Sequence, residues 1–343
     1  MVNGRDGFDA AARTPNRVCM MQRPAAICAL ALLALGLALS GAHAQDYPTR
    51  PIRMIVGYPP GGVVDLAARV VGQKLGDLLG QQVAIDNRGG ASGMIGARAT
   101  AQAAADGYTL FVCPGDLLTL PSLMPHTDFD PTTALLPIAM ISENPLAIVT
   151  AGKAPFSTVR GLENAANARP GGLTYATPGV ASSNNIAGLW LAEAAHIKLV
   201  DVPYRGGAEA ALAVAAGDVA TGIFSPPPII PLVNSGQLKV IALTSARLAS
   251  LPATWPTLAE NGLPVDVTIW NGILAPAGTP AAIVARLERG IQAAVEDEAV
   301  RKRMSLAGTE AKFLGHAAFA ARIRSDTVRF GEVIRKSELE NKQ

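Results

Sequence analysis

The sequence is poor in the residues from which most active sites and metal sites are built. It has three cysteines and four histidines in 343 residues, and charged residues make up only 16% of the chain. The formal net charge of +2 is too small for a surface field that would attract nucleic acid or an anionic membrane. We therefore expect neither nucleic acid nor a lipid surface as a partner.

An N-terminal segment accounts for much of the hydrophobic content. An apolar run from Ala25 to Leu39 ends in the small-residue motif Ala42-His43-Ala44. This order is typical of a secretory signal peptide, so we predict a signal over residues 1–44, with Met20 or Met21 as a candidate for the true start. The alternative is a transmembrane anchor, which needs about 20 apolar residues, more than this run supplies.

Removal of the signal leaves one cysteine, Cys113, so the mature chain has no internal disulfide although a secreted protein enters an oxidising compartment. Packing must then supply the stability, which a chain of about 300 residues can do. We expect the mature protein to be a soluble monomer.

No constellation of catalytic residues stands out in the sequence. Beyond the signal, His126, His196 and His316 are far apart, and no GxSxG, CxxC or SxxK element occurs. Cys113 follows an apolar run, which favours a packed thiol at a strand end over a nucleophile. We therefore predict that the protein is not an enzyme and that it has no cofactor and no metal site.

From Tyr47 onward, short apolar segments alternate with helical patterns. The strand-like segments are 52–58, 81–87, 106–113, 173–177, 198–204, 220–225, 238–245 and 267–276. The helical patterns are 67–78, 92–104, 157–168, 183–195, 207–217, 279–308 and 316–336. This alternation predicts an α/β fold whose sheets carry helices on both faces.

Two long extended segments do not fit simple alternation. The first covers residues 136–152 and is broken by Pro145, and the second covers residues 267–278. Each is long enough to pass from one domain to another. We interpret them as an outward and a return crossing between two domains.

A glycine- and proline-rich turn, Tyr58–Gly62, joins the first strand-like segment to a helical pattern. It lacks the Lys and Ser/Thr of a Walker A loop and the GxGxxG spacing of a dinucleotide site, which argues against a nucleotide. A strand, a glycine turn and a helix start direct unpaired N–H groups at one place, so we predict a small-anion site, such as one for a carboxylate. We expect Asp65, in the first helical turn, to brace this loop rather than contact the ligand.

Two further polar turns follow strand-like segments. One, 113–121, contains Gly115 and Asp116, and the other, 176–188, contains Thr177 and the run Ser182-Ser183-Asn184. The hydroxyls and amides of the second turn either cap the next helix or bind a ligand. Because open α/β sheets bind ligands at the carboxyl ends of their strands, the three turns together predict one binding site.

Several segments resemble motifs of a known family, and they occur along the chain in the same order as in that family. They are YPTRPIRMIVGYPPGGVVDLAAR (47–69), NRGGASGMIGA (87–97), AADGYTLFV (104–112), VPYRGGAEA (202–210), GQLKVIALTSARL (236–248) and ILAPAGTPAAIV (273–284). With them the chain resembles the periplasmic solute-binding receptors of tripartite tricarboxylate transporters, the TctC or Bug family. The resemblance spans nearly the whole mature chain.

The resemblance implies a two-domain, α/β periplasmic-binding-protein type II fold, in which each domain is a mixed sheet flanked by helices and the ligand lies in the cleft. Domain 1 would comprise residues 46–147 and 271–343, and domain 2 residues 148–270. The implied function is capture of a small organic carboxylate by domain closure and its delivery to the inner-membrane subunits of a tripartite tricarboxylate transporter. Two alternatives stay open, a secreted enzyme on the same scaffold and an orphan receptor that signals to a sensor kinase.

The resemblance also implies where the ligand lies. The predicted ligand-binding residues are Tyr58, Pro59, Gly61, Gly62, Gly115, Asp116, Thr177, Ser182, Ser183, Asn184 and Ser225. Ser225 stands where the family often has Asp, which makes an amino-acid ligand less expected. Asp116 stands where small polar residues are common, and its carboxylate would repel a second carboxylate or accept a hydrogen bond from a ligand hydroxyl.

Overall fold

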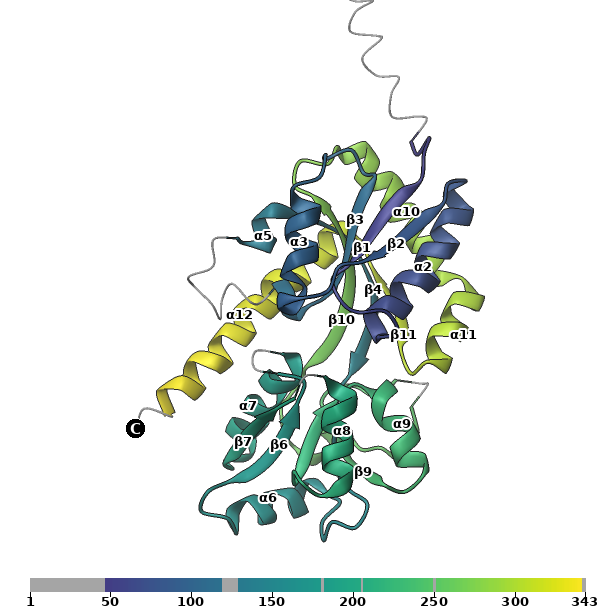
Figure 1. The fold of residues 1–343 in the computed structure, drawn as a ribbon. Coiled ribbons are helices and arrows are strands. Elements are labelled where there is room, and N and C mark those ends of the chain that lie inside the picture. Colours follow the sequence, from purple (N-terminus) through teal and green to yellow (C-terminus); the bar gives the residue numbers. More distant parts are fainter. Residues whose placement is uncertain (1–46, 119–128, 180–181, 205, 249–250, 341–343) are drawn as a thin grey trace, which may run out of the picture. The chain divides into compact units, whose positions relative to one another are not determined.

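Two β-sheets covered by helices make up the computed structural model of this chain (Figure 1). The structure describes residues 47–118, 129–179, 182–204, 206–248 and 251–340, so the predicted signal peptide lies outside the described residues. The chain from Pro48 onward groups into a single unit. In the described part, no helix is long and apolar enough to cross a membrane.

The first sheet has six strands in the order β11-β4-β10-β3-β1-β2. Its strands are β1 (Ile52–Val56), β2 (Val83–Asn87), β3 (Thr109–Pro114), β4 (Leu135–Pro145), β10 (Thr268–Pro276) and β11 (Glu310–Leu314). Strand β1 pairs in parallel with β2 and β3, whereas β10 is antiparallel to β3 and β4. The sheet's helices are α2 (Val63–Leu79), α3 (Met94–Ala101), α5 (Pro131–Ala134), α10 (Ala281–Glu296), α11 (Glu298–Leu306) and α12 (His316–Glu340).

The second sheet has five strands in the order β7-β6-β8-β5-β9. Its strands are β5 (Ala147–Ala151), β6 (Leu173–Thr177), β7 (Leu199–Pro203), β8 (Thr221–Phe224) and β9 (Leu238–Leu243). Its helices are α6 (Val159–Asn167), α7 (Ser183–Ala195), α8 (Gly207–Ala216) and α9 (Pro226–Asn234). Short 3-10 turns lie at Ala91–Gly93 and Ala259–Asn261.

The two sheets repeat one strand order. In the first sheet β2-β1-β3 is followed by the antiparallel β10, and in the second sheet β7-β6-β8 is followed by the antiparallel β5. Both sheets are therefore mixed, as the family resemblance implies. Open α/β sheets bind ligands at the carboxyl ends of their strands, so we expect a ligand at the ends of β1, β3, β6 and β8.

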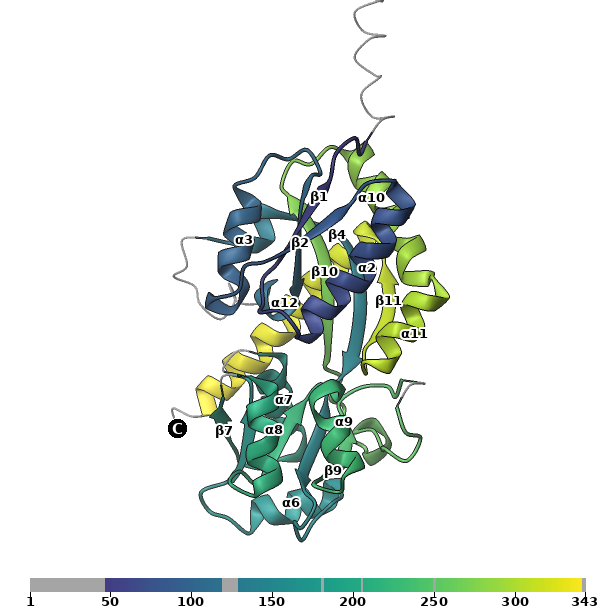
Figure 2. The same ribbon diagram turned by 45° about the vertical axis from the view of Figure 1, so that its right-hand side comes forward.

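Two extended crossings connect the sheets (Figure 2), and the side chain of Thr244 links the two crossings. Leu146 alone separates β4 from β5, and the return crossing enters β10 at Thr268. The Thr244 hydroxyl accepts a hydrogen bond from the Leu146 amide at 3.0 Å and donates one to the Val267 carbonyl at 2.6 Å. The crossings lie where the sequence predicts them, and the assignment of residues to two domains stays a proposal.

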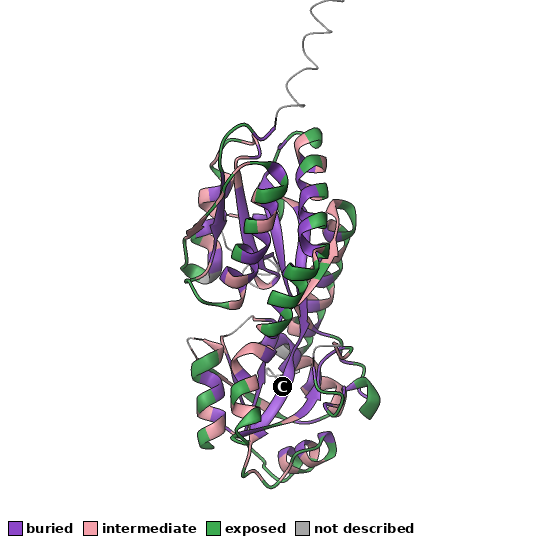
Figure 3. Ribbon diagram, turned by 90° about the vertical axis from the view of Figure 1, so that its right-hand side faces the viewer, coloured by how far each residue is buried: buried purple, intermediate pink, exposed green. Residues whose placement is uncertain are grey.

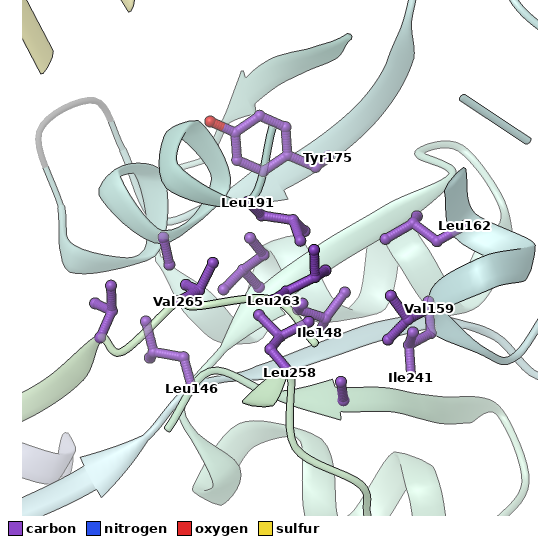
Figure 4. Packing of buried hydrophobic residues seen from close by; sticks show 14 of the residues in the cluster. Leu146, Ile148, Val159, Leu162, Tyr175, Leu191, Ile241, Leu258, Leu263 and Val265 are labelled. Atoms are coloured by element: carbon purple, nitrogen blue, oxygen red, sulfur yellow. The ribbon is translucent and has the colours of Figure 1, made fainter. Parts of the chain in front are cut away.

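Continuous apolar strands explain where the cores lie (Figure 3). Against the first sheet, Phe111 and Trp270 of its strands and Phe319 of α12 are almost fully buried in one cluster. Against the second sheet, a cluster includes Ile148 and Tyr175 of its strands and Leu162 and Leu191 of its helices (Figure 4). Helix α12 contributes Phe330 and Val333 to that second cluster, so it packs on α7 although it begins beside the first sheet.

Candidate functional site

A cavity of about 720 Å³ opens where loops from both sheets meet. Its walls are formed at the carboxyl ends of β1, β3, β6 and β8, with a contribution from β10. The lining residues are Tyr58, Pro59, Pro60, Gly61, Gly62, Val63, Val64, Pro114, Asp116, Pro178, Gly179, Ser182, Asn184, Gly206, Gly207, Ser225, Ile269 and Asn271. This is the edge at which open α/β sheets bind ligands.

A second cavity, of about 780 Å³, lies elsewhere in the structure, beside Gly152 and Gly236. It opens near the amino end of β6, where Thr174 lies in its wall. No predicted site residue lines it. Its position at the opposite end of the strands makes it the weaker candidate for a ligand site.

Helix α2 begins in the cavity wall with free backbone amides. Its N-cap is Gly62, which offers no side-chain cap, and the first backbone hydrogen bond of the helix runs from the Leu66 amide to the Gly62 carbonyl at 2.9 Å. The amides of Val63 and Val64 therefore have no acceptor within the helix. Together with the positive end of the helix dipole, they form a site suited to an anion.

Asp65 lies behind this loop and holds it. Its carboxylate accepts hydrogen bonds at 2.9 Å each from the Gly61 amide, Arg69 Nε and Asn87 Nδ2. Burial alone would raise the pKa of Asp65, but the hydrogen bonds from Arg69, Gly61 and Asn87 lower it below its ordinary value. Asp65 is therefore ionised at neutral pH, and it does not line the cavity.

The turn after β3 brings a carboxylate to the cavity. Oδ1 of Asp116 accepts a hydrogen bond from the Ser183 amide at 3.1 Å and another from the Ser183 hydroxyl. The pKa of Asp116 is raised above its ordinary value, because the effect of burial exceeds the opposite effect of the two hydrogen bonds from Ser183. The contact joins a loop of the first sheet to the first turn of α7, which belongs to the second sheet.

Glycine at position 115 is required by packing rather than by a ligand. A Cβ there would lie 2.5 Å from the Trp270 ring, and the Gly115 amide donates to the Trp270 carbonyl at 3.0 Å. Gly115, a predicted ligand-binding residue, therefore lies in the turn but behind the cavity wall. The tight packing fixes the backbone from which Asp116 projects.

The polar turn before α7 consists largely of capping interactions. The Ser182 hydroxyl accepts from the Asn185 amide at 3.2 Å and donates to the Gly179 carbonyl at 2.7 Å. Asn184 donates to the Ile223 carbonyl at 2.8 Å. Capping, one of the two alternatives for this turn, is therefore present, while Ser182 and Asn184 also line the cavity.

The structure separates the predicted residues into two groups. Those that line the cavity are Tyr58, Pro59, Gly61, Gly62, Asp116, Ser182, Asn184 and Ser225. Gly115, Thr177 and Ser183 lie behind the wall, where Thr177 donates to Asp201 Oδ1 at 2.8 Å. Contact of any of these residues with a ligand stays a prediction.

Sequence reasoning missed the contribution of β10. Asn271 lines the cavity, and only 2% of its surface is exposed. Its Nδ2 donates to the Ser142 hydroxyl at 2.8 Å, whereas its Oδ1 has no hydrogen-bond partner. The one signal in the sequence is a polar residue inside an apolar extended segment.

The remaining candidate nucleophile, Cys113, is fully buried and does not line the cavity. Burial, followed by the charge of Asp116, raises the pKa of this thiol far above its ordinary value, so it stays protonated. Within the described ranges, no group of three or more His, Cys, Asp and Glu residues could hold a metal ion. These observations agree with a packed thiol at a strand end.

Two mixed sheets with a cavity at the carboxyl ends of strands from both define a periplasmic-binding-protein fold. The sequence profile of the tripartite tricarboxylate transporter family receptor, TctC, matches residues 67–339. The chain belongs to this family, whose members are periplasmic binding receptors and not enzymes. The alternative of a secreted enzyme is thereby set aside.

Individual relatives are similar over most of their length. BugT of Bordetella pertussis is 36% identical, over 81% of this chain and 88% of BugT. The structure of R. palustris Rpa4515 with adipate superposes with a TM-score of 0.76 at 27% identity, over 84% of this chain and 97% of Rpa4515. MatC from Rhodopseudomonas palustris with bound malate gives a TM-score of 0.73 at 26% identity, over 84% of this chain and 100% of MatC.

Proposed function

We propose that this receptor captures a small organic carboxylate in the 720 Å³ cavity and delivers it to the membrane subunits of a tripartite tricarboxylate transporter. The observation that carries the proposal is the uncapped start of α2 in the cavity wall. One ligand carboxylate lies against the amides of Val63 and Val64. Charge-assisted hydrogen bonds of this kind are among the stronger ones in proteins.

The surroundings of this anion site support the assignment. Asp65 keeps its charge on the far side of the loop, where Arg69 neutralises it, and so shapes the loop without facing the ligand. The cavity has the size of an ordinary small-molecule pocket. Structures of the relatives Rpa4515 and MatC contain adipate and malate, which are both carboxylates.

Capture works by closure of the two sheets on the ligand, with the crossings at Leu146 and Val267 as the hinge. Closure buries the ligand and brings both sides of the cavity into one surface that a permease can recognise. The membership of the family supports the permease as a partner. The mature protein acts in the periplasm, after removal of the signal.

Thermal unfolding of protein refolded from denaturant, which removes co-purified ligand, tests this function. The probes are adipate, malate and a panel of monocarboxylates, each beside its uncharged amide, such as adipamide. A ligand that binds only the folded state stabilises it by about 2.7 kcal/mol at 100 times its Kd. We expect carboxylates to raise Tm and the amides to leave it unchanged. No rise with any carboxylate, in protein with native circular dichroism, would contradict the proposal.

A further inference from the structure

The start of α7 already holds a carboxyl group, and that group belongs to the protein. Asp116 accepts hydrogen bonds from the Ser183 amide and hydroxyl, and the Ser182 hydroxyl caps the Asn185 amide. A helix start of this kind would otherwise attract a carboxylate of a ligand. In this receptor the position is filled by a side chain from the opposite wall of the cavity.

Asp116 is held in this position by a rigid backbone. The Gly115 amide donates to the Trp270 carbonyl at 3.0 Å, and the Leu118 amide donates to the Gly115 carbonyl at 2.9 Å. Leu117 and Leu118 are almost fully buried. The carboxylate therefore projects from a turn that cannot move aside without loss of core packing.

A second acceptor lies at the same end of the first sheet. Asn271 faces Pro114 in the antiparallel pairing of β10 with β3. Pro114 is two residues before Asp116 in the chain. Its Oδ1 is buried and has no partner in the structure. A buried acceptor without a donor is costly, so a ligand that donates a hydrogen bond here gains affinity.

The charges of the described lining residues favour the same kind of ligand. Asp116 contributes a carboxyl group, and no Lys, Arg or His is found among the lining residues that the structure describes. Helix α8 also starts at the cavity without a side-chain cap, but Glu209 lies in its first turn. A second anion near Asp116 costs either charge repulsion or the uptake of a proton.

We propose that Asp116 and Asn271 make this receptor selective for monocarboxylates whose other end is uncharged and donates a hydrogen bond, such as hydroxy acids, and that they disfavour dicarboxylates. This selectivity rests on the proposed carboxylate-binding function. The carboxylate of the ligand lies on α2, and its hydroxyl lies toward Asn271 and Asp116. The class of ligand follows from the two acceptors on the first-sheet wall.

Isothermal titration calorimetry with matched probes tests the proposal. The probes are adipate, 6-hydroxyhexanoate and hexanoate, with succinate, 4-hydroxybutanoate and butanoate as the shorter set. The variant Asp116→Asn keeps an acceptor for Ser183 and removes the acidic group. Asp77→Asn, on the exposed side of α2 and outside the cavity, is the matched control. Asp116→Ser serves as a second variant if the first does not fold.

At each chain length, we expect the wild type to bind the hydroxy acid at least about tenfold more tightly than the dicarboxylate. This ratio corresponds to a difference in binding free energy of about 1.4 kcal/mol. Asp116→Asn should raise dicarboxylate affinity by about tenfold and change hydroxy-acid affinity less than about threefold. Asn271→Ala should remove the preference for the hydroxy acid over the plain acid. The Asp77→Asn control should change none of these affinities.

A dicarboxylate that binds wild type most tightly would overturn this selectivity and leave the proposed function intact. An equal gain in Asp116→Asn and Asp77→Asn, or no gain in Asp116→Asn, would also overturn it. Failure of all six probes and of the wider carboxylate panel would contradict the proposed function itself, and the selectivity with it.

Discussion

Helices α2 and α7 hold corresponding places in the two sheets, yet their first turns are built differently. Each follows the first parallel strand of its sheet and begins at the cavity. The start of α2 has a glycine N-cap and open amides, whereas the start of α7 is capped by Ser182 and occupied by Asp116. The difference shows that the neighbours of a helix start, rather than the fold, decide whether it is available to a ligand.

Among the changes to these two helix starts, removal of one amide from α2 should have the largest effect on ligand affinity. Val63→Pro deletes an N–H at the first helical position, where proline fits and where Gly62 already has the extended backbone that proline needs before it. Loss of a charge-assisted hydrogen bond should weaken carboxylate binding by about 10- to 100-fold, or about 1.4–2.8 kcal/mol. Calorimetry with the best carboxylate of the panel measures it.

The control for this variant is Ala281→Pro, which places proline at the first position of α10, outside the cavity. It should leave affinity unchanged. Equal affinity in Val63→Pro and wild type would show that the amides of α2 do not hold the carboxylate.

Loss of the brace behind α2 should have an intermediate effect. Asp65→Ala leaves the Gly61 amide, Arg69 and Asn87 without their acceptor, so we expect the free energy of unfolding to fall by about 1–3 kcal/mol and affinity to fall with it. The folded pKa of Asp65 is lowered, so its stabilisation is present above about pH 4 and is lost as the pH falls through the folded pKa. Urea unfolding at several pH values measures the difference.

Asp77→Ala, on the exposed side of the same helix, is the control and should cost little at any pH. A stability difference between Asp65→Ala and wild type that stays constant down to pH 2 would show that the charge of Asp65 plays no part.

The smallest effect on binding should come from the cap of α7. Ser182→Ala removes the acceptor of the Asn185 amide and should lower the free energy of unfolding by about 1 kcal/mol. Because Asp116 still occupies this helix start, ligand affinity should change less than about threefold. The control is Thr158→Ala, which removes the N-cap of α6 outside the cavity and should lower the free energy of unfolding by a similar amount. A large loss of affinity in Ser182→Ala alone would place the ligand on α7.

The sequence predicts the fold well where strands are continuous and apolar, as in β3 and β10. It misses β11, a short edge strand in which Glu310 and Lys312 interrupt the apolar pattern. It also misses α9, because Pro226–Pro228 at its start read as a loop although proline is tolerated in a first helical turn. The predicted helix over 279–308 is two helices, since Asp297 caps α11 and ends the preceding one.

The site is predictable at the level of turns but not of individual contacts. The turns at Tyr58–Gly62 and around Ser182 are visible because glycine, proline and small polar residues follow apolar strands. The contact between Asp116 and Ser183 joins residues 67 positions apart, which no local pattern reports. Asn271 is hidden for the same reason, since only the pairing of β10 with β3 brings it to the cavity.

Helix α12 bears on how far a receptor of this kind can open. Thr244 couples the two crossings at one point, the hinge of the proposed closure. Phe330 and Val333 attach α12 to the second core, and Lys336 reaches Glu193 at 2.7 Å. In the proposed closure this further attachment would limit the rotation of one sheet against the other, unless part of α12 slides or detaches.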